Sequence, residues 1–442
     1  MIDAEPKIAV GVCDRYAVVR GSFRAPYRVG GGETVEGEFT VRNTGGAVEL
    51  TAADGRRFSA PVLGCVPADT GSFVLRDVLF GIQFHWERKE DQEFPGVLQL
   101  HPRPEGTVTA VNVVPLEVYL ESVIASEMSG EAPAEFLKAH AITSRSWLAA
   151  MLERGRRNVG VPARRGVEGS EEVVRWYDRE DHDIFDVCAD DHCQRYQGLT
   201  RLASGLARQA VAGTRGLFLI HGGAVCDARF SKACGGRSEE FRNAWEDTDV
   251  PYLRSVSDAG VEHPPVRTEE EARRWMETSP EAWCNTADAG VLRRVLPSFD
   301  RETADFFRWE VRYGAEELTA IVRERSGVDF GRITALEPLA RGPSGRITRL
   351  RIRGTARTLV VGKELEIRRW LSRSHLYSAA FVVDAAPGPG GMPTTLTLRG
   401  AGWGHGVGLC QIGAAVMATR GASARDIVLH YFRGAELRAL YS

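Results

Sequence analysis

The hydrophobic pattern of this 442-residue chain changes near residue 107, and that change constrains the fold more than any other feature. Before it, short runs such as KIAVGV, YAVVRG, GEFTVR and GVLQLHP are separated by turn-rich stretches such as RVGGGET and NTGG. This arrangement is typical of β-strands. From 107 to 153, apolar residues instead recur with the period of a helix. We therefore expect a β-rich region over residues 1–106, followed by a core that contains helices.

The rest of the chain alternates between the two patterns. We expect strands at GLFLIHG, AVCDARFS, ITRLRIRG and RTLVVG, and short helices at KELEIRRWL, QIGAAVMATRG and ARDIVLHYF. Residues 265–326 contain amphipathic patterns such as EEEARRWME and AEELTAIVRERSG, which predict a helical insertion. The predicted class is α+β, with segments at 1–106 (β-rich), 107–258 (first part of the core), 259–330 (helical insertion) and 331–442 (second part of the core).

Composition excludes several classes of protein. The formal net charge of -3, with 26% charged residues, gives no electrostatic reason to expect a nucleic-acid partner. No apolar run reaches about 18 residues, so no transmembrane segment is expected. The start, MIDAEPKIAV, lacks a basic region followed by an apolar one, so no signal peptide is expected and the localisation stays open.

Glu127 occupies a position where an apolar residue is expected. In a helix that begins near Pro115, one stripe is formed by Leu116, Tyr119, Leu120, Val123 and Ile124. Glu127 continues this stripe, whereas Glu117 and Glu121 fall to its flank and are expected to be solvated. A carboxyl group on an apolar surface must find a partner, ionise late or open onto a cleft. Glu127 is therefore either a general acid/base or a carboxylate hydrogen-bonded to the next helix.

A second predicted helix follows, with Pro133 in its first turn. Its apolar face consists of Phe136, Leu137, Ala141, Trp147, Leu148 and Met151. His140 and Ser144 lie on that same face, next to the break SGEAP in which a cleft could open.

The loop GAGWGHGVGLCQIGA places Trp403 and His405 among glycines. It contains no GxGxxG and no βαβ unit surrounds it, so a dinucleotide site is disfavoured and no organic cofactor is expected. Dense glycines allow a backbone to approach a ligand closely, and a tryptophan with an imidazole suits a sugar ring. A tight structural loop fits this pattern equally well.

The segment HDIFDVCADDHC supplies candidate metal ligands, namely His182, Cys188, His192 and Cys193. Thiolate and imidazole at short spacing suit Zn²⁺, although the spacing is not that of a zinc finger. Reduced thiols or a local disulfide are the alternatives. In FSKACGG, Ser231 and Cys234 could serve as nucleophiles, but no base is identified and a structural turn is favoured.

Eight segments together resemble the SpoIID/LytB family of bacterial sporulation and cell-wall proteins. They run in the family's order over about residues 107–437: VNVVPLEVYLESVIASEM, EFLKAHAITSRSW, CQRYQG, AVAGTRG, ARFSKACGGRSEEF, PYLRSVSD, SGRITRLRIRG and GAGWGHGVGLCQIGAAVMATRGASARDIVLHYF. The first and last of these are long and unusual, so the resemblance is specific.

This resemblance implies a lytic transglycosylase that cleaves the MurNAc–GlcNAc bond of peptidoglycan and leaves a 1,6-anhydroMurNAc end. It assigns the general acid/base to Glu127. The glycan strand, including strands stripped of stem peptides, would be bound by His140, Ser144, Arg145, Ser231, Trp403, His405 and Gln411. Some family members hold zinc near this position, which implies Cys188 and Cys193 with His182 or His192. The alternative is a non-catalytic cell-wall binding module that enhances a partner amidase.

Overall fold

A computed structural model describes residues 3–82, 87–157, 166–177, 182–202, 204–297, 300–301 and 305–442. The chain forms two compact units, each assembled from separate stretches of sequence. The first contains Met1–Glu131, Arg179–Leu217 and Ala439–Ser442, and the second contains Ala132–Asp178 and Phe218–Arg438. The subdivision of the sequence at residues 106, 258 and 330 stays a prediction.

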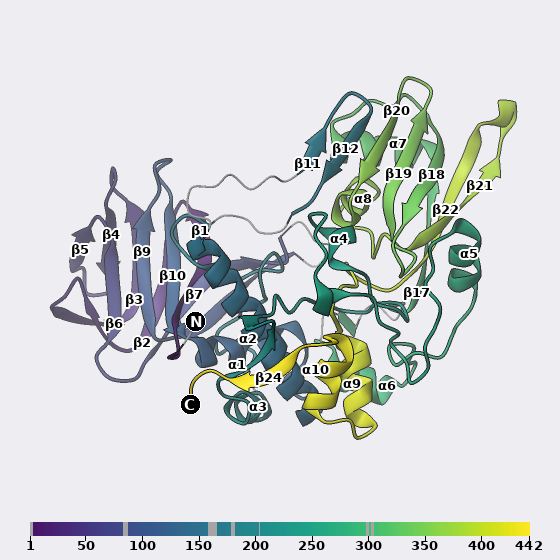
Figure 1. The fold of residues 1–442 in the computed structure, drawn as a ribbon. Helices are drawn as coiled ribbons and strands as arrows, with labels where there is room; N and C mark the ends of the chain where they lie inside the picture. Colours follow the sequence, from purple (N-terminus) through teal and green to yellow (C-terminus); the bar gives the residue numbers. More distant parts are fainter. Residues whose placement is uncertain are drawn as a thin grey trace. The chain divides into compact units, whose positions relative to one another are not determined.

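The first unit is built on one large, mainly antiparallel sheet (Figure 1). Its strands are β1 (Lys7–Tyr16), β2 (Val19–Val29), β3 (Glu33–Asn43), β4 (Val48–Ala52), β5 (Arg57–Ala60), β6 (Leu63–Pro67), β7 (Ser72–Phe80), β8 (Arg88–Pro95), β9 (Val97–Pro102), β10 (Val108–Pro115) and β13 (Val187–Cys188). The order is β13-β1-β10-β9-β6-β2-β3-β4-β5, with β7 joined to β2 and β8. The predicted β-rich region is confirmed.

Two helices and a row of aromatic side chains complete the first unit. The helices are α1 (Leu116–Glu127) and α3 (Leu206–Ala212). Phe23 stacks on Tyr27 with ring centroids 4.5 Å apart, and Phe73 and Phe94 continue the row. Alternate residues of the strands supply this core because successive side chains of a strand point to opposite faces.

The second unit combines helices with several smaller sheets. Its strands are β11 (Gly166–Glu168), β12 (Glu172–Arg175), β14 (Leu217–His221), β15 (Ala224–Val225), β16 (Phe230–Ser231), β17 (Arg308–Gly314), β18 (Ile333–Arg341), β19 (Ile347–Gly354), β20 (Thr358–Gly362), β21 (Phe381–Pro387), β22 (Pro393–Ala401), β23 (Leu409–Cys410) and β24 (Glu436–Ala439). One sheet has the order β11-β12-β20-β19-β18 and another β17-β22-β21, while β16 pairs with β23.

The helices of the second unit match most of the predicted ones. They are α2 (Ala134–Arg157), α4 (Phe241–Ala244), α5 (Glu269–Glu277), α6 (Ala289–Val295), α7 (Ala315–Ser326), α8 (Glu364–Trp370), α9 (Gln411–Thr419) and α10 (Ala424–Tyr431), with 3-10 turns η1 (Pro251–Leu253) and η3 (Pro389–Gly391). The predicted helical block also contains a strand that was not expected, β17, which pairs along its whole length with β22.

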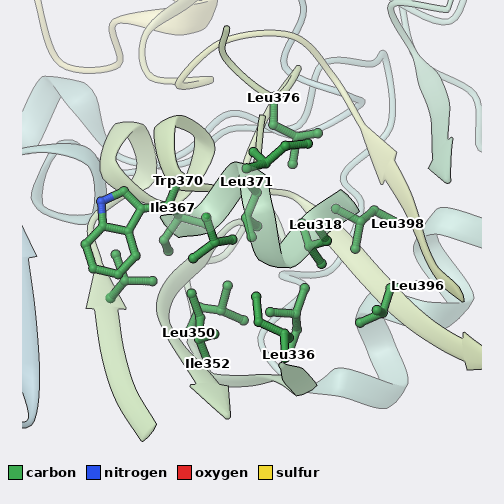
Figure 2. Close-up of a cluster of buried hydrophobic side chains, with 14 of the residues drawn as sticks. Leu318, Leu336, Leu350, Ile352, Ile367, Trp370, Leu371, Leu376, Leu396 and Leu398 are labelled. Atoms are coloured by element: carbon green, nitrogen blue, oxygen red, sulfur yellow. The ribbon is translucent and has the colours of Figure 1, made fainter. Parts of the chain in front are cut away.

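A buried apolar cluster joins α7 and α8 to the sheet β18-β19-β20 and to β22. Figure 2 shows side chains from these elements meeting, among them Leu318, Trp370, Leu350 and Leu398. Each of these four side chains is at most 1% exposed. The described residues are 25% helix and 37% strand, so the predicted α+β class is confirmed. Among the described residues, no helix has the length and apolar character needed to span a membrane.

Candidate functional site

Glu127 is the last residue of α1, and its side chain is buried. The helix begins after Pro115, whose fixed φ suits a helix start, and ends where Met128 turns to an extended conformation. The five apolar residues of the predicted stripe are at most 1% exposed, and Glu127 is only 9% exposed. The prediction that this carboxyl group faces the interior is therefore confirmed.

The segment Gln194–Gln197 supplies a hydrogen-bond partner of Glu127. The backbone N–H of Arg195 donates to Glu127 Oε1 at 2.9 Å. The same segment contacts α1 twice more, because Tyr119 donates to Gln194 Oε1 at 3.2 Å and Gln197 N–H donates to Ser122 Oγ at 3.1 Å. A backbone amide held in this way stabilises negative charge on the carboxylate.

The other two acids of α1 differ from each other. Glu117 is 6% exposed and accepts hydrogen bonds from the Tyr441 hydroxyl at 2.6 Å and from Gly216 N–H at 3.4 Å. The expectation that Glu117 is solvated is therefore wrong, because the end of the chain returns to cover it. Glu121 stays partly exposed and pairs with Arg208 at 3.3 Å.

The four predicted metal ligands come together in the first unit. The ligand atoms of His182, Cys188, His192 and Cys193 all lie within 4.8 Å of one another. Cys193 Sγ lies 3.4 Å from His182 Nε2 and 3.5 Å from His192 Nδ1, and Cys188 Sγ lies 3.9 Å from the same His192 nitrogen. Two thiols and two imidazoles form a donor set that fits tetrahedral Zn²⁺.

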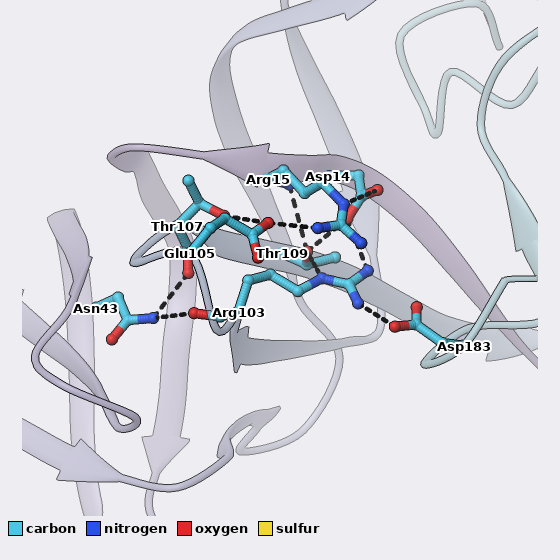
Figure 3. Close-up of polar contacts among 8 residues, drawn as sticks. All are labelled: Asp14, Arg15, Asn43, Arg103, Glu105, Thr107, Thr109 and Asp183. Atoms are coloured by element: carbon cyan, nitrogen blue, oxygen red, sulfur yellow. Dashed lines mark hydrogen bonds and ion pairs between the residues drawn. The ribbon is translucent and has the colours of Figure 1, made fainter.

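Backbone pairing and one buried arginine fix this cluster in place. Cys188 ends β13, which pairs in parallel with β1, and a tight turn closes with the bond from Cys193 N–H to the Asp190 carbonyl. On the other side, Arg103 donates to Asp183, the neighbour of His182, as well as to Asp14 and Thr109 (Figure 3). The loop that carries the ligands is therefore held at both ends.

The environment of Cys188 favours its ionised form, which is the form that binds metal. A hydrogen bond from the Cys193 thiol, together with the His182 and His192 side chains, outweighs burial and holds the pKa of Cys188 well below its usual range.

The His/Cys cluster and Glu127 are connected by a single short stretch of backbone. Cys193 is a candidate ligand, and Arg195, two residues later, donates its amide to Glu127. A cavity of about 110 Å³ lies beside Cys188 and is lined also by Gly11, Asp190 and Tyr196. Sites that enclose a drug-sized ligand usually exceed about 300 Å³, so this cavity is too small for a disaccharide.

His140 and Gln411 form a buried pair in the second unit. His140 is 0% exposed and packs between the rings of Phe136 and Phe230. Gln411 Nε2 donates to His140 Nε2 at 3.1 Å. Burial, together with the nearby charge of Lys232, lowers the pKa of His140 to about 3, so the imidazole is neutral near pH 7.

Three further predicted substrate-binding residues are also buried in this unit. Ser144 and Arg145 lie on α2 and are 0% exposed, and Ser231 lies on β16, where it pairs with Cys410 of β23. Their assignment to glycan binding stays a prediction.

The glycine loop holds Trp403 and His405 against other aromatic rings. Trp403 stacks on Phe306 with ring centroids 4.8 Å apart and meets Tyr377 edge-on at 5.3 Å. His405 is half-buried, contacts Trp245 at 4.8 Å and accepts the Val407 N–H at Nδ1. Burial and the nearby Arg229 hold the pKa of His405 well below its usual range.

Sequence reasoning missed the buried arginine that supports this loop. Arg346 is 1% exposed and donates to the carbonyls of Gly404 and Cys234 and to Ser344 Oγ. Ser344 in turn donates to Glu239, whose own N–H donates to the Gly406 carbonyl. Gly406 has φ 73° and a Cβ there would lie 2.4 Å from the Arg346 guanidinium, so only glycine fits. The charged residues within SGRITRL and RSEEF are the sequence signal from which this network could have been predicted.

A comparison with known protein families finds a match for the region around Glu127. Residues 104–221 match the family model described as "Stage II sporulation protein", SpoIID. These residues belong to the SpoIID family. This SpoIID segment contains Glu127, His140, Ser144, Arg145 and the four His/Cys ligands. Residues 239–408 match a second model, a domain of unknown function (DUF8618), which includes Trp403 and His405.

Similarity to SpoIID proteins extends beyond that segment. "Stage II sporulation protein D" of Bacillus amyloliquefaciens is 25% identical over 329 residues, covering 74% of this chain and 75% of that protein. The protein of the same name from Bacillus subtilis (strain 168) is 26% identical over 330 residues, covering 74% and 76%. An uncharacterised protein of Brachyspira hyodysenteriae is 24% identical over 345 residues, covering 78% and 72%.

Removing Arg346 should destabilise the second unit. We expect Arg346→Met to lower the free energy of unfolding by about 3–5 kcal/mol, because Glu239 and two carbonyls would remain buried without their cation. The matched control is Arg349→Met on β19, whose side chain is 50% exposed and pairs with Glu172, and which should cost at most about 1 kcal/mol. Denaturant unfolding of the wild type and the two variants measures both losses of stability. Equal losses would contradict the stabilising role of Arg346.

The His/Cys cluster should bind zinc. We expect Cys193→Ala to lower the zinc content of the purified chain by about one equivalent, because a tetrahedral site loses a thiolate. Cys65→Ala is the control, since Cys65 is buried in the same unit and lies outside the cluster. Elemental analysis provides the measurement, and an unchanged zinc content in Cys193→Ala would exclude this cluster as the site.

Proposed function

We propose that this protein is a peptidoglycan lytic transglycosylase in which Glu127 is the single general acid/base. The proposal is supported by membership of residues 104–221 in the SpoIID family and by similarity to two proteins named stage II sporulation protein D. These relatives indicate a role related to sporulation and the cell wall. The observation that carries the chemistry is the buried Glu127 carboxyl group, held at the end of α1 by the Arg195 amide.

The reaction requires one carboxyl group that gives a proton and then takes one back. Protonated Glu127 would donate its proton to the glycosidic oxygen while the C1–O bond of MurNAc breaks. The Glu127 carboxylate would then accept the proton of the C6 hydroxyl as the C6 oxygen bonds to C1. The product carries a 1,6-anhydro ring, and Glu127 ends in its starting state.

The Arg195 amide has a defined part in this cycle. Its N–H points at Glu127 Oε1, so it would stabilise the negative charge that appears there after the first proton transfer. Because the amide is already in place, no reorganisation is needed at that moment. The three contacts of residues 194–197 with α1 keep it there.

Zinc held by His182, Cys188, His192 and Cys193 would have a structural role, since four protein ligands leave no open position for substrate. The last two of those ligands, His192 and Cys193, precede Arg195 by only three and two residues. We infer that the cluster positions the amide that contacts Glu127, while the proton transfers belong to Glu127 itself.

The residues of the second unit are proposed to bind the glycan. His405 is the best placed of them because it is only half-buried, whereas His140 and Gln411 are enclosed. We therefore propose that His140 and Gln411 act indirectly, by positioning the elements next to the glycine loop. Glycan strands, including strands without stem peptides, are the proposed substrate.

Glu127→Gln tests the mechanism. Glutamine retains an oxygen that can accept the Arg195 amide, so the fold should be preserved while the transferable proton is lost. General acid/base groups contribute about 10²- to 10⁴-fold, so release of anhydro sugar should fall by at least that factor. Glu121→Gln is the control on the same helix, because Glu121 is partly exposed and pairs with Arg208. It should stay within a few-fold of wild type.

The readout is mass spectrometry of products from purified glycan strands, with a thermal melt of each variant. Full activity in Glu127→Gln would end the proposed mechanism. A wild-type chain that binds glycan strands but releases no product would favour the alternative, a wall-binding module that enhances an amidase.

A further inference from the structure

A second group of side chains of the kinds that bind metals lies inside the second unit. Cys234 follows β16, Asp258 follows η1, Cys284 lies between α5 and α6, and Cys410 ends β23. All four residues are at most 2% exposed. Their ligand atoms nevertheless converge to within 4.8 Å of one another. Four segments of the chain therefore deliver three thiols and one carboxyl group to a single buried point.

The spacing of the sulfur atoms suits a metal ion. Cys234 Sγ and Cys284 Sγ are 3.8 Å apart. A disulfide needs about 2.05 Å. Two thiolates bound to one tetrahedral Zn²⁺ through bonds of about 2.3 Å lie about 3.8 Å from each other.

The groups around the cluster are those that orient metal ligands. The Tyr431 hydroxyl donates to Asp258 Oδ1 at 2.5 Å, and Cys284 N–H donates to Asp258 Oδ2 at 2.9 Å. Cys234 N–H donates to Cys410 Sγ at 3.3 Å. Hydrogen bonds of this kind, made to the ligand side chains, orient metal ligands and stabilise their negative charge. A Cβ on Gly413 would come within 2.2 Å of Asp258 Oδ1, so α9 can approach the carboxyl group only with glycine at this position.

A cation would also be needed for these four groups to be ionised together. Three thiolates and a carboxylate would be costly to bury together without one. The guanidinium of Arg308 donates hydrogen bonds to the Gly235 and Phe307 carbonyls. Its positive charge interacts electrostatically with Cys234 and Cys284. One guanidinium balances one charge of four, and a divalent cation among the ligands balances two more.

We propose that Cys234, Asp258, Cys284 and Cys410 bind one Zn²⁺ in a closed, structural site. Three sulfur ligands select a thiophilic metal, and four protein ligands complete a tetrahedron. This site is separate from the His/Cys cluster of the first unit, and it does not depend on the proposed transglycosylase activity.

Elemental analysis of the full chain tests this site once the first cluster is removed. The wild type should hold about two equivalents of zinc, and Cys188→Ala/Cys193→Ala should keep about one. Adding Cys284→Ala to this variant should reduce zinc below about a tenth of an equivalent. Adding Cys226→Ala instead should leave it unchanged, because Cys226 is equally buried in the same unit but lies outside the cluster.

A second measurement covers the case in which Cys284→Ala does not fold. Cobalt exchanged into Cys188→Ala/Cys193→Ala should show the visible absorption of tetrahedral cobalt bound to thiolates. The site would be overturned if this folded variant held no zinc and took up no cobalt, or if it held iron instead of zinc. It would also be overturned if alkylation without reductant showed Cys234 linked to Cys284.

Discussion

The contacts between residues 194–197 and α1 are the constraint on which the proposed chemistry of the first unit depends. Tyr119, Ser122 and Glu127 lie on one side of α1, and each bonds to this segment, so the helix fixes the backbone and the backbone fixes the Glu127 carboxyl group. Cys193 and the rest of the His/Cys cluster lie just upstream of this segment. A change in the ligand loop would therefore reach Glu127 through the short backbone stretch from Cys193 to Arg195.

In the second unit, a comparable role belongs to buried polar groups. Arg346 bonds to the carbonyls of both Gly404 and Cys234, and thus links the glycine loop to the segment that carries one of the proposed zinc ligands. Glu239 contributes through Ser344 and through its own amide to Gly406. Glycines at this density have a high conformational entropy in the unfolded chain, so a loop of this kind keeps a single shape only when its carbonyls are bound from outside.

The sequence was sufficient where the determining contacts are local. The period of 3.6 predicted α1, α5, α7 and α10, the alternation of apolar residues predicted the N-terminal strands, and the short spacing of His182, Cys188, His192 and Cys193 predicted a cluster that the fold brings together. It failed where partners are distant. Glu117 was expected to be solvated because one of its partners, Tyr441, is 324 residues away. Strand β17 was missed because its pairing with β22 lies outside any local window. Cys234, Asp258, Cys284 and Cys410 share no spacing that marks a site.

The two proposed metal sites differ in the length of chain between their ligands, and this difference has an energetic consequence. His182 and Cys193 are 11 residues apart, whereas Cys234 is 50 residues from Cys284 and 176 from Cys410. The entropy lost by an unfolded chain on cross-linking grows with the logarithm of loop length. Zinc in the first cluster would therefore order a short loop beside Glu127, while zinc in the second would join β16, β23 and the segment between α5 and α6. The first kind of site shapes local geometry, and the second stabilises a unit whose parts are far apart in the sequence.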